Sequence, residues 1–130
     1  EMCIRDSGWV IGHAQSGGGN QIFRWNGQGW DLMPGGAVRI GGTYSSPWIV
    51  NSSKQIFRWN GSAWDLVSGW AVDVGDGWVI GHAQSGGGNQ IFRWNGQGWD
   101  LMPGGAVGIG GTYSSPWIVN SSKQIFRWND

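Results

Sequence analysis

The 130-residue sequence predicts an all-β protein, and two observations support this. The chain has 26 glycines and 12 tryptophans but little alanine, leucine or glutamate, so helix formers are scarce and turn formers abundant. It also repeats Gln-Ile-Phe-Arg-Trp-Asn from Gln21, Gln55, Gln90 and Gln124, at steps of 34, 35 and 34 residues. Short aromatic runs between glycine-rich turns favour a β-propeller of four-stranded antiparallel blades over a helical solenoid of similar period.

The blades come in pairs. Gly8–Asn60 and Gly77–Asn129 differ at one position only, where Arg39 becomes Gly108. The larger unit therefore spans 69 residues and contains two related halves, each the length of one blade. We expect about four blades, two complete and two partial: 8–36 (partial), 37–70, 71–105 and 106–130 (partial).

The complete unit 37–70 divides into four expected strands joined by short polar links. These strands are Ala37–Ile40, Trp48–Asn51, Gln55–Asn60 and Ala63–Val67. With the first strand innermost, the Thr-Tyr-Ser-Ser-Pro link and the Asn-Gly turn lie on one face of the disk. The first blade is then expected to begin at its second strand, and the last to end before its fourth.

The Asn-Gly turn permits two hairpin registers. A two-residue turn sets Trp25 opposite Gln28, whereas a four-residue loop sets Trp25 opposite Trp30 and Arg24 opposite Asp31. We favour the second register, because it pairs aromatic with aromatic and cation with anion. The tryptophans are then expected to pack between blades, and the arginine and aspartate to form a neutralised polar contact.

One position in the inner strands varies. It carries Arg39, Asp73 or Gly108 in the sequences Ala-Val-Arg-Ile, Ala-Val-Asp-Val and Ala-Val-Gly-Ile. A position that accepts a cation, an anion or no side chain is expected to face water. We place it on the central channel.

Paired blades predict a ring with an even number of blades. Three 69-residue units would give six blades, of which this chain is an arc, and a closed four-bladed ring is the alternative. Residues 1–7 match no part of the repeat and are interpreted as a non-repeat leader, either an assembly scar or disordered. Incomplete terminal blades would expose apolar faces and favour self-association.

The order of motifs resembles the tectonin β-propeller repeat. Ala71–Gly75 and Gly77–Ile80 are followed by Gln90–Gly96, a tryptophan-containing strand and a Pro-Gly-Gly link. The resemblance covers Gly8–Asp130. It implies a six-bladed ring and a lectin that binds glycans or lipopolysaccharide, or a docking module in a larger intracellular protein. A lectin of this kind favours an extracellular or cell-surface location.

Catalysis has little support in the sequence. His13 and His82 are one position in two copies, each in a glycine-serine loop with no acid or nucleophile at a recognisable spacing. Asp73–Gly77 lacks the regular oxygen ligands of a calcium loop, and Ser16–Asn20 lacks the lysine and helix of a phosphate loop. We expect no enzyme activity, no cofactor and no metal site.

Charge and length exclude other partners. Eight basic and eight acidic residues cancel, so nothing indicates nucleic acid or an anionic membrane. No apolar run approaches the roughly 18 residues of a membrane-spanning helix, and membrane insertion is not expected. The single cysteine, Cys3, excludes an internal disulfide.

Binding of a small polar ligand is better supported. Sugars combine an apolar face with hydroxyls, and they suit exposed aromatic rings flanked by amides, hydroxyls or charged groups. Trp70 is unusual because glycine, Gly36 or Gly105, occupies the matching position in the other units. We interpret Trp70 as either a plug at a junction between blades or an exposed platform for a ligand. The candidate ligand-binding residues are His13, Gln15, Asn20, Tyr44, Trp70, His82, Gln84, Asn89 and Tyr113.

The sequence thus predicts a carbohydrate-binding, lectin-like propeller with repeated weak sites in loops and between blades. Equivalent weak sites gain avidity on a repetitive target, such as a glycan or lipopolysaccharide-like surface. The alternatives are a protein-docking propeller and a ligand-free structural repeat segment of a larger protein.

Overall fold

The computed structural model describes residues 3–4 and 8–128, and their regular structure is entirely β. The all-β prediction is therefore confirmed. The first sheet contains β1 (Cys3–Ile4), β2 (Trp9–Ser16), β3 (Gly19–Trp25) and β4 (Trp30–Ala37). The second contains β5 (Arg39–Gly42), β6 (Pro47–Val50), β7 (Gln55–Trp59) and β8 (Trp64–Trp70). The third contains β9 (Asp73–Val74), β10 (Trp78–Ser85), β11 (Gly88–Trp94) and β12 (Trp99–Ala106), and the fourth contains β13 (Gly108–Gly111), β14 (Pro116–Val119) and β15 (Ile125–Arg127).

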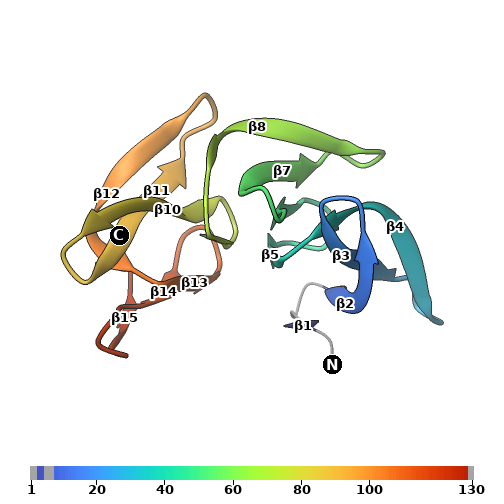
Figure 1. Cartoon of the computed structure of the whole chain (residues 1–130), viewed down its shortest axis with the longest axis horizontal. Coiled ribbons are helices and arrows are strands. Elements are labelled where there is room, and N and C mark those ends of the chain that lie inside the picture. Colours follow the sequence, from blue (N-terminus) through green and yellow to red (C-terminus); the bar gives the residue numbers. More distant parts are fainter. Residues whose placement is uncertain (1–2, 5–7, 129–130) are drawn as a thin grey trace.

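Each sheet is antiparallel and pairs its strands in chain order. The four sheets follow one another around a centre, from the first sheet on the right of Figure 1 to the fourth at the lower left. Strands β5, β9 and β13, which begin the second, third and fourth sheets, contact one another. The expected small antiparallel units are therefore present, whereas the closed ring and its blade number stay predictions.

The first sheet has one strand more than the sequence predicts. Cys3 lies opposite Ile11 and Ile4 opposite Val10, so β1 supplies the inner strand that the repeat pattern lacks at this end. The expectation that this unit begins at its second strand is wrong, because backbone pairing to a free edge needs no repeat sequence. Residues 1–2 and 5–7 of the predicted leader lie outside the described residues. The fourth sheet ends with its third strand, as expected.

The four-residue register is confirmed. Trp25 lies opposite Trp30 and Arg24 opposite Asp31, and the second and third sheets repeat this pairing. The Asn26 side chain fixes the loop. Its Oδ1 accepts hydrogen bonds from Gln28 N at 2.8 Å and Gly29 N at 2.9 Å, and its Nδ2 donates to Asp31 Oδ1 at 2.8 Å. An asparagine can satisfy the turn backbone and the following strand at once, which explains why Asn recurs there.

The arginine and aspartate of the second sheet's hairpin engage other partners than each other. In the second sheet, Arg58 Nε donates to Ser46 Oγ at 3.0 Å, and the guanidinium lies 5.0 Å from the centre of the Trp48 ring. Asp65 accepts from Asn60 Nδ2 at 2.9 Å. The expected Arg58–Asp65 contact is therefore wrong, because opposite strand positions do not dictate where long side chains end.

Tryptophans join consecutive sheets. A tryptophan on the second strand of one sheet packs against the tryptophan pair of the next sheet's hairpin, and we call these three rings a tryptophan triad. Ring centroids lie 5.6–6.0 Å apart across the sheets and 5.0 Å apart within each pair, at tilted or edge-on angles that aromatic rings prefer. The triads are Trp9 with Trp59 and Trp64, and Trp48 with Trp94 and Trp99.

The triads also carry hydrogen bonds between sheets. Trp64 Nε1 donates to the Pro34 carbonyl at 2.9 Å, and Trp99 Nε1 donates to the Ser68 carbonyl at 2.8 Å. Each of these half-buried indoles thus satisfies its single polar group on the neighbouring sheet. Packing and polar contacts therefore specify the same junction.

Burial of the hairpin tryptophans depends on whether another sheet covers them. Trp59 is 6% exposed and Trp94 is half-buried, as predicted. Trp25 is 41% exposed, so the same prediction is wrong there. The Trp25 ring packs against Trp30 of its own hairpin, and the described core clusters include neither ring. Trp117 of the fourth sheet is also exposed and also lies outside these clusters.

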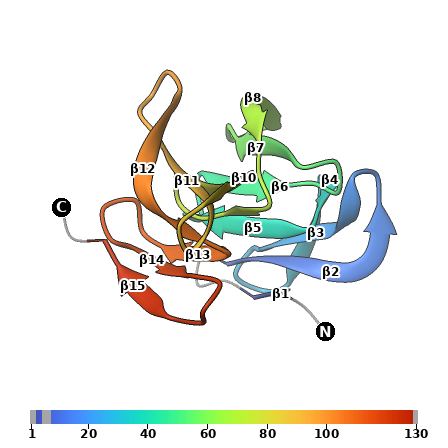
Figure 2. The same cartoon turned by 60° about the vertical axis from the view of Figure 1, so that its left-hand side comes forward.

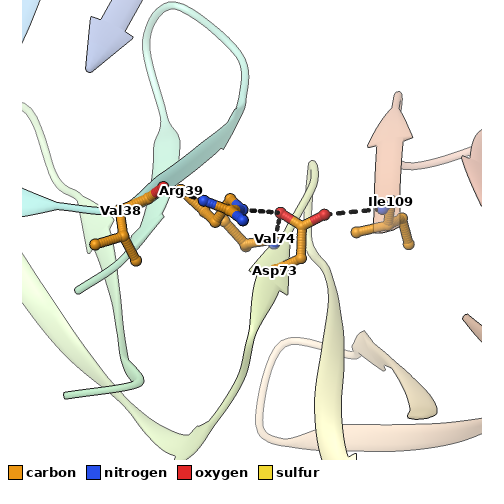
Figure 3. Close-up of polar contacts among 5 residues, drawn as sticks. All are labelled: Val38, Arg39, Asp73, Val74 and Ile109. Atoms are coloured by element: carbon orange, nitrogen blue, oxygen red, sulfur yellow. Dashed lines mark hydrogen bonds and ion pairs between the residues drawn. The ribbon is translucent and has the colours of Figure 1, made fainter. Parts of the chain in front are cut away.

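The inner strands meet at Asp73 (Figure 3). Its Oδ1 accepts from Val74 N at 2.9 Å and lies 3.9 Å from Arg39 Nε, and its Oδ2 accepts from Ile109 N at 3.0 Å. Arg39 is exposed, as expected, but Asp73 is buried. The prediction that this position faces water is therefore wrong for Asp73. Its hydrogen bonds and a nearby cation offset the loss of hydration.

The inner strands also approach one another closely. A Cβ placed on Gly41 would lie 2.6 Å from the Val74 carbonyl oxygen. Because the backbone fixes the position of a Cβ and the carbonyl oxygen is itself backbone, no rotamer change could relieve that contact. Glycine at this position lets the second and third sheets meet at the centre.

We predict that Trp59→Ala destabilises the protein far more than Trp25→Ala. Truncation of Trp59 leaves a cavity in a triad and should lower the free energy of unfolding by about 3–5 kcal/mol. Truncation of the half-exposed Trp25 should lower it by roughly 1 kcal/mol. Urea unfolding followed by circular dichroism measures both losses. Equal losses would show that the triad does not hold the sheets together.

We also predict that Asp73→Ala lowers the free energy of unfolding by about 1–3 kcal/mol, because it leaves two backbone N–H groups without their acceptor at the centre. Thermal unfolding of the purified variant tests this. A midpoint that matches the unmodified protein would contradict a stabilising role for Asp73.

Candidate functional site

The clearest polar site lies in the second sheet. The link between β5 and β6 and the turn between β7 and β8 border an open cavity of about 310 Å3. The sequence places these two loops on one face, and the shared cavity agrees with that placement. The residues that line it are Ser45, Ser46, Arg58, Trp59, Asn60 and Asp65.

Local hydrogen bonds hold these side chains in place. Arg58 is tied to Ser46, and Asn60 is tied to Asp65. Asn60 Oδ1 also accepts from two turn amides at 2.9 Å, so the turn itself is fixed. A guanidinium has five N–H donors and a carboxylate has two oxygens, so these bonds leave much of their capacity for a ligand or water.

The two predicted tyrosines join sheets. Tyr44 donates its hydroxyl to the Trp25 carbonyl at 2.5 Å, and its own carbonyl accepts from Trp9 Nε1 at 2.8 Å. Tyr113 repeats both bonds with the third sheet. Both rings are nevertheless partly exposed, and Tyr44 directly precedes the cavity residue Ser45. The hydroxyls therefore serve the fold, and a guanidinium lies over each ring, Arg24 at 6.0 Å from the centre of Tyr44 and Arg93 at 5.9 Å from that of Tyr113.

The histidine, glutamine and asparagine candidates lie at the other end of the sheets. In the first sheet, Gln15 pairs with Asn20 in register, and Gln15 Nε2 donates to Asn20 Oδ1 at 2.9 Å. His13 is exposed two residues before Gln15 on β2. Because the loop after β3 begins at the opposite end of that strand, the structure does not bring this set together with Tyr44.

The third sheet repeats this arrangement. Gln84 lies opposite Asn89 in the backbone register, while the Gln84 side chain lies outside the described part of the structure. His82 is exposed and Asn89 is half-buried.

Trp70 is largely exposed and is not buried in a junction between sheets. Its side chain is 68% exposed at the end of β8, and it lies opposite Gln55. It borders a second cavity, of about 220 Å3, between the second and third sheets. The other residues that line this cavity are Ile56, Gly69, Val79, Phe92 and Trp99.

Sequence reasoning missed Arg58 and Asp65 as site residues, because it interpreted them as partners of each other. The signal was available in the spacing: the favoured register and the shared face of the two loops bring both beside Ser45 and Ser46. Within the described residues, no group of three or more His, Cys, Asp or Glu side chains could hold a metal ion. No helix in that part of the chain is long and apolar enough to cross a membrane.

Compared with protein-family models and with curated protein sequences, the chain matches none. The resemblance to the tectonin repeat therefore stays a prediction that rests on the motifs alone.

Proposed function

We propose that the protein binds carbohydrate in the cavity of the second sheet. The observation that carries this proposal is the lining: a cation, a carboxylate, an amide and two hydroxyls converge on about 310 Å3. Planar charged and amide groups can each engage two neighbouring hydroxyls of a sugar ring. Held in place by their own hydrogen bonds, they lose little freedom when a ligand binds.

Other features fit the same ligand class. The partly exposed ring of Tyr44, next to Ser45 in the chain, offers an apolar surface for a sugar C–H face. The charges of Arg58 and Asp65 balance, which suits a neutral ligand more than a strongly charged one.

Elements of the site recur in the other sheets. Arg127 Nε donates to Ser115 Oγ at 2.8 Å in the fourth sheet, as Arg58 does to Ser46. Asn95 donates to Asp100 in the third sheet, as Asn60 does to Asp65. Recurrent weak sites favour a repetitive target such as a lipopolysaccharide-like or glycan-coated surface. In this proposal the chain is a tectonin-like lectin whose sheets are blades of a propeller.

A glycan array that includes lipopolysaccharide cores, followed by calorimetry with the strongest ligand, tests the proposal. Asp65→Ala and Arg58→Met should each weaken binding by at least about tenfold, because hydrogen bonds to charged groups contribute roughly 1.5–3 kcal/mol. A blank array from a folded sample would refute carbohydrate binding.

Asp31→Ala is the matched control. It removes the same asparagine–aspartate bond from the first sheet's turn, 2.8 Å long, without touching the cavity. Its stability should fall as that of Asp65→Ala does, while its affinity for the glycan stays unchanged. If both variants lose affinity equally, the cavity of the second sheet is not the binding site.

Protein docking is a second candidate, and the exposure of Trp70 beside an apolar cavity favours it. Tryptophans of this kind often dominate protein interfaces. Trp70→Gly introduces the residue found at the matching positions Gly36 and Gly105, so it should leave the fold intact. A docking surface predicts that a partner captured from extract resists competing free sugar and is lost with Trp70→Gly. Capture that free sugar abolishes would instead assign the contact to glycan.

A further inference from the structure

Two residues in which the second sheet differs from the first and third lie together. The end of β8 carries Trp70, where the other two sheets have glycine, and Lys54 precedes the repeated Gln-Ile-Phe, where they have asparagine. Gln55, the next residue, lies opposite Trp70 in the register, and the Lys54 carbonyl accepts a hydrogen bond from Ala71 N at 3.0 Å. Two separate departures from the repeat therefore lie side by side at one end of the sheet.

Lys54 has an unusual backbone conformation. Its φ is 69°, in the left-handed region, and the other described residues with positive φ are glycines, apart from Lys123 in the same turn of the fourth sheet. A lysine in this conformation costs free energy that a glycine would avoid. Its side chain is exposed, and in the part of the chain that the structure describes it forms no ion pair. The turn thus presents a positive charge that no neighbouring carboxylate neutralises.

The cavity beside Trp70 is apolar. It measures about 220 Å3 and lies between the second sheet and the third, to which the chain passes directly from β8 (Figures 1 and 2). Two of the residues that line it, Ile56 and Val79, are 1% and 2% exposed, whereas Trp70 is 68% exposed. Another lining residue, Trp99, already donates its Nε1 hydrogen bond to the Ser68 carbonyl. The cavity therefore suits an apolar group and offers little to the hydroxyls of a sugar.

The junction between the first and second sheets has a similar cavity without these two residues. It measures about 190 Å3, and Gly36 lies at the position that Trp70 takes in the next sheet. The apolar residues that the second sheet contributes to it match in position those that the third sheet contributes to the other cavity. An exposed indole with an ammonium nearby is thus what distinguishes the cavity between the second and third sheets.

We propose that this cavity and Lys54 together bind an organic acid with an apolar chain. The chain packs in the cavity against the Trp70 indole, and the acid group forms an ion pair with the Lys54 ammonium. The flexible four-carbon stem of lysine lets the ammonium follow an acid group at the edge of the cavity. Lys54 directly precedes β7, whereas the proposed carbohydrate cavity borders the turn that follows β7, so neither site depends on the other.

Charge complementarity selects an acid over a neutral or cationic ligand. The next carboxylate after Trp70 in the chain, Asp73, is buried and bonded to Val74 N and Ile109 N. Asp65 lies at the opposite end of β8 from Trp70. An ammonium without a carboxylate partner attracts an anion, and their attraction strengthens where the apolar chain of the ligand excludes water.

The test uses the full 130-residue chain and three probes with the same alkyl chain: octanoate, octyl phosphate and octanol. Each probe is titrated below the concentration at which it forms micelles, while nuclear magnetic resonance follows the indole N–H signals of Trp70 and Trp99. At least one of the two acids should shift both signals saturably, with one ligand per chain. It should bind at least about threefold more tightly than octanol, because the ion pair adds to the burial of the chain. The tighter acid identifies the preferred acid group. No saturable shift, or equal affinity for all three probes, would overturn the proposal.

Variants of Lys54 separate its charge from its backbone conformation. Lys54→Gly keeps the left-handed turn, so the midpoint of thermal unfolding should hold or rise, while the affinity for the preferred acid falls by at least about threefold, to that for octanol. Lys123→Gly is the matched control. It makes the same change in the same turn of the fourth sheet and should leave the affinity for the acid unchanged. Acid binding that Lys54→Gly leaves unchanged, or that both variants weaken equally, would contradict the assignment.

Trp70→Gly locates the apolar chain of the ligand. It introduces the residue that the first and third sheets have and removes the indole, so the acid should bind at least about tenfold more weakly, as measured with the Trp99 signal. The acid should also leave glycan binding unchanged, because the cavity beside Arg58 lies at the other end of the second sheet. Acid binding that survives Trp70→Gly, or that displaces a glycan, would show that the ligand lies elsewhere.

Discussion

The packing of one tryptophan against a tryptophan pair on the next sheet is the interaction on which the structure depends. Each sheet has three or four short strands, and a sheet of that size gains its stability by burying a face against a neighbour. The two complete triads use the same strand positions and the same indole-to-carbonyl hydrogen bond, so the repeated residues specify both junctions in the same way. A repeated sequence therefore produces a repeated interface.

The repeated hairpin also positions the candidate sites. The Asn-Gly hairpin that aligns the tryptophans also places Arg58 and Asp65 at one end of the sheet, where they meet the Ser45–Ser46 link. Asp73 and the closely spaced inner strands join the sheets at the centre, away from these loops. Apart from Trp59, which also belongs to a triad, the residues of a ligand site on such loops can vary without disturbing the triads.

Much of this fold could be predicted from the sequence because the repeat shows each solution several times. The hairpin register followed from pairing like residues, and the positions of the tryptophans followed from the register. Other features depend on neighbours that a repeat cannot reveal: β1 lies outside the repeat and still pairs with β2, and Asp73 is bonded to Ile109 and lies near Arg39, both from other sheets. Two tryptophans show the same limit of prediction from the repeat. Trp25 is exposed although Trp59, at the matching position, is buried, and Trp70 is exposed at a position where the other units have glycine.

Exchange of the indole N–H protons, followed by nuclear magnetic resonance, tests the junctions most directly. Trp9, Trp64, Trp78 and Trp99 each donate their indole hydrogen bond to another sheet, so their N–H protons should exchange slowly. The Trp70 proton, on a side chain exposed to water, should exchange fast. If all five protons exchange at the rate of Trp70, the sheets do not pack through their tryptophans and this description of the fold is wrong.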